Sequence, residues 1–485
     1  MSPLSSSFQP RDTYQEGDSY KLLPFRFTRL DESRVVLTNI AGEHVVVPTG
    51  IVPDLVERRL HHRQGYFQEL ESAHFISRGD DRSHVELLAA QIRTRQSRLP
   101  DLASLHIFVV TLRCNHTCKY CQVSRVSEDR SAFDMSVDTA DRAVEIMLQS
   151  PAASMKVEFQ GGESLLNFAL IRHIVLRTKE LGARRDLSFV VATNLSMITD
   201  EMLDFFAEHR VDISTSLDGP RELHDANRTK VGNDAYDHTI AGIKRCRSRL
   251  GKDAVSALMT ATAASLEQPE AIIDEYVTQG FSEIFLRHIN PYGFALRSAA
   301  QIGYQTDRYI EFYKRGLAHI IRLNQRGVRF REVYTSIVLG RMLTPFPSGY
   351  VDLQSPAGAG LATLVYNYDG DVYASDEGRM LKEMGDTTFK LGNVHTSNWG
   401  NIHYDSSLLQ FAYESMTEGV PSCSECAFQP WCGSNPVGHH ATQGDIVGHK
   451  PSSSFCRRSM AIFRHLVTLL EDDPGVASIL RSWVR

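Results

Sequence analysis

The chain is long, moderately charged and has a small net charge for its size. It has 485 residues, 42% hydrophobic and 23% charged, as expected for a soluble globular protein of about two to four domains. A formal net charge of -6 gives no basic footprint, so we predict no nucleic-acid substrate. The first twenty residues are polar and no run of about 18 apolar residues occurs, which predicts a cytoplasmic protein without a membrane segment.

The eight cysteines are too few for a disulfide scaffold in a chain of this length. Seven of them fall in two tight groups, and only Cys246 stands apart, within a helical pattern where a buried apolar role is the default. Clustered thiols indicate metal binding.

The N-terminal part is expected to be a disordered tail over 1–19 and a small α+β module over 20–100. Short β-rich runs start at Leu22, Arg34 and Glu43 and predict strands, whereas the patterns over 53–63 and 84–95 predict helices. A structural extension is the simpler interpretation. The alternative is a peptide-docking domain that offers a strand edge to an extended substrate.

A regular alternation of apolar strands and amphipathic helices follows over 101–305. Parallel βαβ units are its natural outcome, and six of them suit a partial (β/α)6 TIM barrel, in an α/β protein whose functional residues follow the strand C-terminal ends. The predicted strands are 105–112, 155–160, 187–193, 211–217, 255–262 and 283–289, and the predicted helices are 136–148, 168–181, 200–209, 236–247 and 269–279. A helical linker over 306–350, a cysteine-containing domain over 351–460 and a C-terminal helix over 461–485 complete the expected organisation.

The first cysteine group is Cys114, Cys118 and Cys121, spaced C-x3-C-x2-C directly after the first barrel strand. Three thiolates on one loop can bind three irons of a [4Fe-4S] cluster and leave the fourth iron open to a reactant. A zinc site with His116 as fourth ligand and three structural cysteines are the alternatives. Zinc sites usually pair two separated knuckles, which favours the cluster.

This spacing, its place in the βα series, and Tyr120 before the third cysteine resemble the radical S-adenosylmethionine (SAM) superfamily. The resemblance implies that SAM chelates the open iron and is cleaved to methionine and a 5'-deoxyadenosyl radical. After the second strand, Gly161, Gly162 and Glu163 are similar to the family's GGE segment, whose backbone and acid meet the SAM ammonium group. Glycine allows close approach of the backbone to a ligand. At the following position, where proline is common in the family, this chain has Ser164.

Further matches follow the next strands. Thr193 and Asn194 end the third strand, and the fourth leads into S-x-D-G-P-x3-H-D-x2-R, a pattern similar to that of peptide-modifying members. The resemblance implies that Ser216 and Arg228 contact the SAM carboxylate, a role that suits the planar guanidinium. The sixth strand offers Arg287, His288 and Asn290 as further cavity candidates, although each could equally be structural.

The second cysteine group supplies four thiolates, enough to saturate a closed [4Fe-4S] cluster or a zinc knuckle. The segment resembles the SPASM domain of radical SAM enzymes that modify ribosomal peptides (RiPP maturases), where two auxiliary clusters are common. Serines at 355 and 375, and Asn435 and Pro436, stand where that pattern has cysteines. The resemblance therefore implies one auxiliary cluster, and two [4Fe-4S] clusters in total, with the auxiliary ligands Cys423, Cys426, Cys432 and Cys456.

Two carboxylates are candidate catalytic bases. Asp376 directly follows one lost cysteine position, where some relatives carry the base, and Asp218 lies in the fourth-strand motif. For each, a turn-forming acid is the alternative interpretation.

Together these features predict an oxidoreductase that abstracts hydrogen from a precursor peptide, with SAM as cofactor and flavodoxin or ferredoxin as electron donor. The N-terminal segments around Leu23 and Val36 resemble the maturase of the His-Xaa-Ser peptide system, which suggests a cross-link such as a cyclophane. Epimerisation, thioether formation and residue oxidation would use the same motifs. An activating or sulfatase-maturing enzyme, and a non-catalytic metal-binding peptide scaffold, are the alternatives.

Overall fold

The chain divides into two compact units in the computed structural model. The first comprises Met1–Ser97, Gly340–Pro347 and Pro421–Trp431, and the second comprises Arg98–Leu339, Ser348–Val420 and Cys432–Arg485. The predicted tail over 1–19 lies outside the described residues. The residues that the structure describes are 20–61, 65–78, 82–121, 123, 129–290, 292–404 and 406–484.

The first unit contains a three-stranded antiparallel sheet in the order β2-β3-β4, with β1 and β5 paired separately. Alternating valines and Leu37 of β3 and β4 pack with residues of α1 and α2 in one apolar core. The elements are β1 (Lys21–Leu22), β2 (Phe25–Arg29), β3 (Arg34–Asn39), β4 (His44–Pro48), α1 (Ile51–Val56), α2 (Gly65–Ser72), β5 (Ile76–Ser77) and α3 (Ser83–Arg95).

Segments from late in the sequence complete this first unit. The Thr38 hydroxyl donates to the Ala427 carbonyl, 389 positions away, and Trp431 Nε1 donates to the Gly42 carbonyl at 2.8 Å. Arg95 donates to the Pro430 carbonyl at 3.0 Å. Local periodicity carries no signal for such distant pairing, so the sequence predicted only the continuous part.

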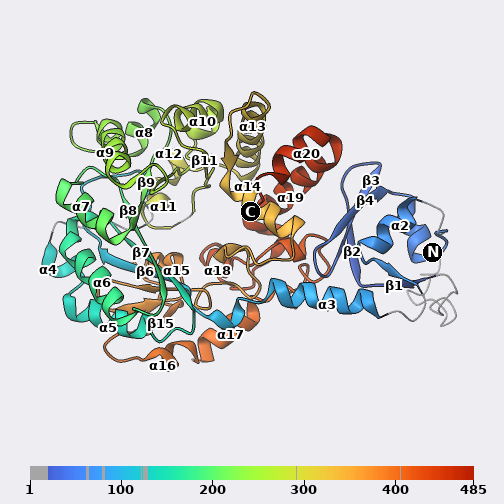
Figure 1. Ribbon diagram of the computed structural model, residues 1–485, viewed down its shortest axis with the longest axis horizontal. Coiled ribbons are helices and arrows are strands. Elements are labelled where there is room, and N and C mark those ends of the chain that lie inside the picture. Colours follow the sequence, from blue (N-terminus) through green and yellow to red (C-terminus); the bar gives the residue numbers. More distant parts are fainter. Residues whose placement is uncertain are drawn as a thin grey trace. The chain divides into compact units, whose positions relative to one another are not determined.

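The second unit is built on parallel strands that alternate with helices, as predicted (Figure 1). Five strands pair in consecutive order and all in parallel, and helices lie along their outer face. The strands are β6 (Leu105–Thr111), β7 (Ser154–Gly161), β8 (Asp186–Thr193), β9 (Val211–Ser216) and β10 (Val255–Leu258), and the helices are α5 (Val137–Met147), α6 (Phe168–Leu181), α7 (Asp200–His209), α8 (Arg221–Asn227), α9 (Ala235–Leu250) and α10 (Pro269–Thr278). Hydroxyl caps fix two helix starts, because Ser136 accepts from the Thr139 amide and Thr199 from the Met202 amide.

The same sheet continues beyond β6 into the C-terminal half of the chain. β13 (Thr363–Tyr366) pairs in parallel with β6, and the antiparallel strands β14 (Asp371–Tyr373) and β15 (Lys390–Asn393) follow it. The result is one eight-stranded sheet in the order β10-β9-β8-β7-β6-β13-β14-β15, the α/β architecture expected of the barrel core.

The sixth predicted barrel strand differs from the prediction. Only Glu283–Ile284 form a strand, β11, which pairs in parallel with β12 (Arg331–Glu332) and not with β10. The Leu286 amide donates to the buried Glu332 carboxylate at 3.0 Å instead of continuing the ladder. The Arg287 carbonyl accepts from the Ala261 amide at 2.8 Å, so this segment lies beside the end of β10 without extending the eight-stranded sheet.

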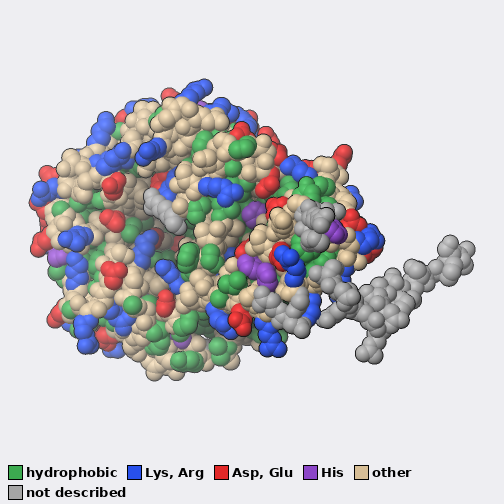
Figure 2. All heavy atoms as spheres, turned by 45° about the vertical axis from the view of Figure 1, so that its right-hand side comes forward, with side chains coloured by type: hydrophobic (Ala, Val, Ile, Leu, Met, Phe, Trp, Pro, Cys, Tyr) green, Lys and Arg blue, Asp and Glu red, His purple; other side chains and the backbone are tan. Residues whose placement is uncertain are grey.

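The remaining elements are mostly helical. No helix among the described residues combines the length and apolar character needed to cross a membrane. On the face shown in Figure 2, basic and acidic side chains are interspersed and not gathered by sign. The helices are α4 (Arg130–Phe133), α11 (Phe294–Arg297), α12 (Ala299–Ile302), α13 (Thr306–Gln325), α14 (Val333–Leu343), α15 (Asp376–Lys382), α16 (Trp399–His403), α17 (Ser406–Glu414), α18 (Pro436–Gln443), α19 (Ser454–Asp472) and α20 (Pro474–Arg481).

Candidate active site

A cavity of about 720 Å³ lies in the second unit, within the size range of small-molecule sites. Residues from the ends of β6, β7, β8 and β9 line it, together with residues that follow β14. Most of the predicted site residues therefore meet in one space, whereas Glu163 and Asp218 lie behind its wall. The predicted residues on the wall are Cys114, Cys118, Tyr120, Cys121, Gly161, Gly162, Thr193, Asn194, Ser216, Arg228 and Asp376.

The first cysteine loop is held by backbone hydrogen bonds to the segment after α8. The Thr117 amide donates to the Thr229 carbonyl at 2.7 Å, and the Lys119 amide donates to the Asn227 carbonyl at 3.0 Å. Burial raises the pKa of the Cys114 thiol to about 12 and that of Cys118 to about 11. Because the thiols are the protonated species at neutral pH, metal binding at this loop must release their protons.

His116 lies in the same loop and is buried. Neither ring nitrogen has a hydrogen-bond partner among the described residues, and burial lowers the pKa of the imidazole to about 4. In the described part of the chain no three cysteine, histidine, aspartate or glutamate side chains meet closely enough to hold a single metal ion. A cubane differs from such a site because each thiolate binds a separate iron.

The two glycines after β7 are required by crowding from the cysteine loop. A Cβ atom on Gly161 would lie 2.0 Å from the Thr111 carbonyl oxygen, and one on Gly162 would lie 2.1 Å from that of Arg113. Gly161 also has φ +142°, which disfavours any side chain. The glycines thus let the end of β7 pack against the backbone that leads into the cysteine loop. The sequence suggested instead that they allow a ligand to approach.

Glu163 is fully buried and organises the end of β8. Its carboxylate accepts hydrogen bonds from the Thr193 hydroxyl at 2.6 Å and from the Asn194 amide at 2.8 Å. Burial raises the pKa of this carboxyl. The geometry gives Glu163 a positioning role for two cavity residues, and its contact with the SAM ammonium group stays a prediction.

Asp218 is fully buried behind the cysteine loop, and its carboxylate accepts from the Thr260 amide at 3.4 Å as well as from two side chains. The Tyr120 hydroxyl donates to its carboxylate at 2.7 and 2.8 Å, and Arg228 donates through Nε at 3.2 Å and Nη2 at 3.3 Å. The Arg228 guanidinium also lies 5.2 Å from the centre of the Tyr120 ring. This network joins Tyr120, which precedes Cys121, to the motif that follows β9. Because its carboxylate is already hydrogen-bonded, Asp218 is poorly placed to act as a base.

Asp376 lies on the cavity wall in the first turn of α15. Its carboxylate accepts a hydrogen bond from Nε of the buried Arg379 at 2.9 Å. The preceding Ser375 caps the helix by accepting from the Gly378 amide at 3.1 Å. Asp376 therefore lines the cavity while it is ion-paired with Arg379.

Sequence reasoning missed three polar residues of β7 that face the cavity. Lys156, Glu158 and Gln160 line it, and the intervening Met155, Val157 and Phe159 are fully buried. Strands of a parallel sheet are usually apolar on both faces, so a strict polar alternation in such a strand was the available signal. The pattern marks the face of β7 that turns toward the barrel interior.

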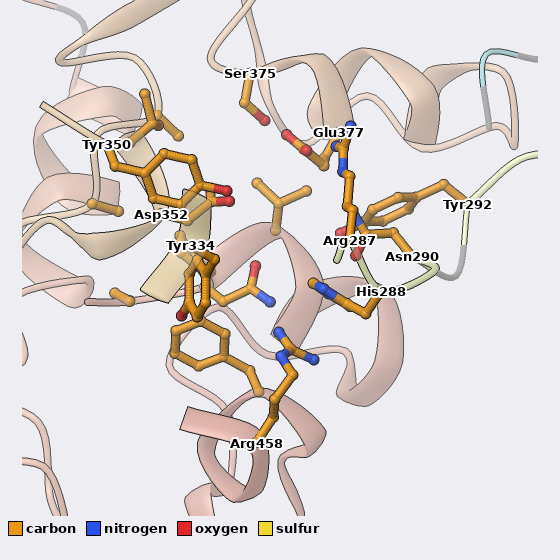
Figure 3. Close-up of a pocket in the computed structure, with 18 of the residues that line it drawn as sticks. Arg287, His288, Asn290, Tyr292, Tyr334, Tyr350, Asp352, Ser375, Glu377 and Arg458 are labelled. Atoms are coloured by element: carbon orange, nitrogen blue, oxygen red, sulfur yellow. The ribbon is translucent and has the colours of Figure 1, made fainter. Parts of the chain in front are cut away.

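A smaller pocket of about 70 Å³ adjoins the cavity (Figure 3). Six of its lining residues were named from the sequence, Arg287, His288 and Asn290 as cavity candidates and Ser375, Asn435 and Pro436 as lost cysteine positions, and the others were missed. Two of its acids have perturbed ionisation. Burial raises the pKa of Glu377 to about 7, with further contributions from the charges of Asp352 and Asp376, and burial raises the pKa of Asp352 as well. Asp352 is accessible from the cavity, yet protein atoms surround it densely.

Comparison with known proteins identifies the cavity-bearing core. Residues 108–275 match the model of the radical SAM superfamily. They form a radical SAM domain. The cysteine loop, the glycine pair and the β9 motif all fall within this radical SAM domain, and the wall formed by 349–380 lies outside it.

Similar proteins extend the likeness beyond the domain. A serine-type anaerobic sulfatase-maturating enzyme of Bacteroides thetaiotaomicron is 22% identical over 74% of this chain and 88% of its own length. Among solved structures, native anSMEcpe with bound AdoMet matches with a TM-score of 0.63 and 16% identity over 78% of this chain and 99% of its own. SuiB of Streptococcus suis bound to precursor peptide SuiA matches with a TM-score of 0.53 and 13% identity over 90% and 100%. These structures share the fold.

The chain spans 66%, 46% and 48% of the lengths of the first curated relatives that it matches. A radical SAM domain implies SAM and a [4Fe-4S] cluster as cofactors, and the residues present fit both. Three thiols on one loop would supply the cluster ligands, and the other predicted SAM contacts, except Glu163, line the same cavity. The second cysteine group is partly buried, with Cys423 and Cys426 in the first unit and Cys432 and Cys456 in the second. Its role as a ligand set stays a prediction.

Proposed function

We propose that this chain is a radical SAM oxidoreductase that modifies a ribosomally made precursor peptide. The observation that carries the proposal is the meeting of three thiols, the glycine pair and Arg228 on one cavity wall. When bound, the reduced cluster and SAM supply a 5'-deoxyadenosyl radical that abstracts hydrogen from a substrate carbon. The chain's own residues position these groups and exclude water from the reacting space.

In this proposal Cys114, Cys118 and Cys121 hold the first cluster, and the Asp218 network keeps Tyr120 and Arg228 in place beside it. Glu163 orients Thr193 and Asn194 toward the cavity. Ser216 and the guanidinium of Arg228 meet the SAM carboxylate. Arg228 donates to Asp218 through Nε and Nη2. In this proposal the other edge of its guanidinium donates to the SAM carboxylate.

A peptide substrate is supported by the extent of the cavity and by the structural relatives. The cavity continues from the cysteine loop to Tyr350 and Asp376, well beyond the predicted SAM contacts. SuiB, which shares this fold, binds a precursor peptide. We propose an intramolecular cross-link such as a cyclophane as the product, as in the His-Xaa-Ser system that the N-terminal segments resemble.

A second candidate is oxidation of a residue of a protein partner. The sulfatase-maturating relative from Bacteroides thetaiotaomicron aligns over 74% of this chain and supports this alternative. Peptide cross-linking and residue oxidation share the first hydrogen abstraction, so they differ only in the fate of the substrate radical.

We further propose one auxiliary [4Fe-4S] cluster on Cys423, Cys426, Cys432 and Cys456, where it accepts the surplus electron. The serines at two expected cysteine positions support the absence of another cluster. Ser355 donates to Glu418 and accepts from the Thr417 amide at 2.9 Å, and Ser375 caps α15. Both hydroxyls therefore serve local structure.

The module over 20–100 is proposed to dock the peptide. In the sheet order β2-β3-β4, both β2 and β4 are edge strands, and an extended peptide can add to such an edge through main-chain hydrogen bonds. Phe27 on β2 is 53% exposed and offers an apolar contact there.

The test is anaerobic reconstitution followed by assays for 5'-deoxyadenosine and for peptide mass. We expect about eight irons per chain, SAM cleavage with flavodoxin or dithionite, and a mass change in a small peptide encoded beside the gene when both are co-expressed. A metal-binding scaffold predicts neither product. Absence of 5'-deoxyadenosine with a competent reductant and a loaded cluster would overturn the enzyme proposal, whereas SAM cleavage without any modified peptide would overturn only the choice of substrate.

A further inference from the structure

The cavity and the smaller pocket share one wall that lies outside the radical SAM domain. Seven residues line both spaces, and we call the five polar ones among them, Arg287, Tyr350, Asp352, Ser375 and Glu377, the shared wall. Among them, Arg287 is basic, whereas Asp352 and Glu377 are acidic. The wall therefore joins the reaction space to a polar pocket that holds acids and bases.

Glu377 lies at the centre of the shared wall, in the first turn of α15. Figure 3 shows the Glu377 carboxylate next to the Arg287 guanidinium, and the Ser375 hydroxyl points into the same pocket. The side chains of Asp352 and Tyr350 lie together on another side of this pocket. The charges of Asp352 and Arg287 both act on Glu377. Its neighbour Asp376 instead bonds Arg379, so two adjacent acids have different partners.

We propose that Glu377 is the catalytic proton acceptor of the peptide modification, with Asp352 and Arg287 as the residues that set its charge state. This inference rests on the proposed function. It differs from the sequence prediction, which offered Asp376 and Asp218. Of those two acids, Asp218 is locked behind the wall by Tyr120 and Arg228, and Asp376 is committed to Arg379.

The proton and electron balance is complete with the groups named. The 5'-deoxyadenosyl radical takes one hydrogen atom from a substrate C–H bond and becomes 5'-deoxyadenosine. The substrate radical then forms its new bond while it gives one electron to an iron-sulfur cluster and one proton to the Glu377 carboxylate. The substrate is oxidised by two electrons overall.

The environment of Glu377 suits this role. A general base works best when its pKa lies near the working pH, and burial together with Asp352 brings Glu377 to about 7. The groups that face it are few. Asp352 and Asp376 raise its pKa, Arg287 lowers it, and the buried hydroxyls of Tyr292 and Tyr350 lie within reach of its charge.

The decisive variant is Glu377→Gln, assayed with the peptide shown to be modified by the wild-type chain. We expect the ratio of modified peptide to 5'-deoxyadenosine to fall by about 10² or more, the usual contribution of a general base. Glu383→Gln is the matched control, since Glu383 ends the same helix, is partly buried and lines neither space. Its ratio of modified peptide to 5'-deoxyadenosine should equal that of wild type.

A pH series provides the second readout. The yield of modified peptide per 5'-deoxyadenosine should fall as the pH drops through about 7, because the base must be deprotonated. Asp352→Asn should move this midpoint to lower pH, since it removes a negative neighbour, and Arg287→Met should move it to higher pH. Infrared titration of the loaded chain without peptide should show a protonated carboxyl with the same midpoints, which Glu377→Gln removes.

The outcomes separate this inference from the proposed function. A wild-type chain that cleaves SAM but modifies no peptide contradicts the proposed function. If wild type makes the product and Glu377→Gln retains it, or if the two neighbouring variants leave the midpoint in place, Glu377 is not the proton acceptor. Loss of product in Asp376→Asn with retention in Glu377→Gln would transfer the role to Asp376.

Discussion

The acids on two sides of the same cavity differ in their hydrogen-bond and charge partners. On the barrel side, Asp218 is neutralised by Arg228 and Tyr120, and Glu163 accepts hydrogen bonds from the end of β8. On the shared wall, Glu377 lies beside another acid, and its pKa rises to about 7. The barrel side thus pairs its acids with hydrogen-bond donors, whereas on the shared wall the charge of Asp352 adds to the effect of burial on Glu377.

The largest effect should come from the two cysteine groups. Cys118→Ala removes a ligand of the first cluster, so 5'-deoxyadenosine should become undetectable and about four irons should be lost. Cys456→Ala should also lose about four irons, yet it should still cleave SAM, with modified peptide reduced instead. Iron analysis and product assays test this difference. Equal loss of SAM cleavage in both variants would contradict separate roles for the two groups.

The next largest effect should be on the buried ion pair of the barrel wall. Asp218→Asn leaves Arg228 as an uncompensated buried charge, which typically costs about 3–5 kcal/mol of unfolding free energy. Asp212→Asn, at an exposed position of β9, the strand that precedes Asp218, should change stability by no more than about 0.5 kcal/mol. Urea denaturation measures both. A destabilisation of Asp218→Asn no larger than that of Asp212→Asn would show that the network is not needed for the wall.

A smaller effect should follow from crowding between β7 and the cysteine loop. Gly161→Ala should cost about 2–4 kcal/mol, because its Cβ meets the Thr111 carbonyl and its backbone has positive φ. Gly251→Ala provides the control, since Gly251 also has positive φ but open space around it, and about 1 kcal/mol is expected. Thermal unfolding and SAM affinity should separate them. Similar values for the two variants would mean that the loop yields to the added methyl group.

The smallest effect concerns the stability cost of the shared wall. A carboxyl with a raised pKa destabilises the fold as pH rises from its unfolded value, near 4.5, through its folded value of about 7. Glu377→Gln should therefore raise the unfolding temperature above about pH 7, with no gain below about pH 4.5. Melting curves across this range test the sign. A loss of stability at high pH would indicate that the ionised carboxylate is favourably paired.

Much of the barrel was predictable because its signals are local. The helix over 168–181 has the predicted bounds, and Ser136 and Thr199 cap their helices through their own side chains. The cysteine loop and the β7 glycines follow strand ends, and strand ends of a parallel sheet meet at one edge. For that reason residues from four separate loops line one cavity, as their order along the chain indicated.

The sixth strand and the choice of acid were decided by tertiary contacts. The pattern over 283–289 predicted a sixth barrel strand, yet only Glu283–Ile284 form a strand, and the Leu286 amide donates to Glu332 on the paired strand β12. Asp376 and Glu377 are adjacent acids in the sequence, and only the positions of Arg379, Arg287 and Asp352 distinguish them.

The sequence by itself determined the βα core, the cysteine loop and the residues that surround the predicted SAM position, since these depend on periodicity and on short motifs. Only the tertiary structure decided that β13 extends the barrel sheet beside β6 and brings α15 to the cavity. The physical reason is burial. The pKa of a carboxyl depends on the charges and the protein atoms packed around it, and those come from segments far apart in the chain.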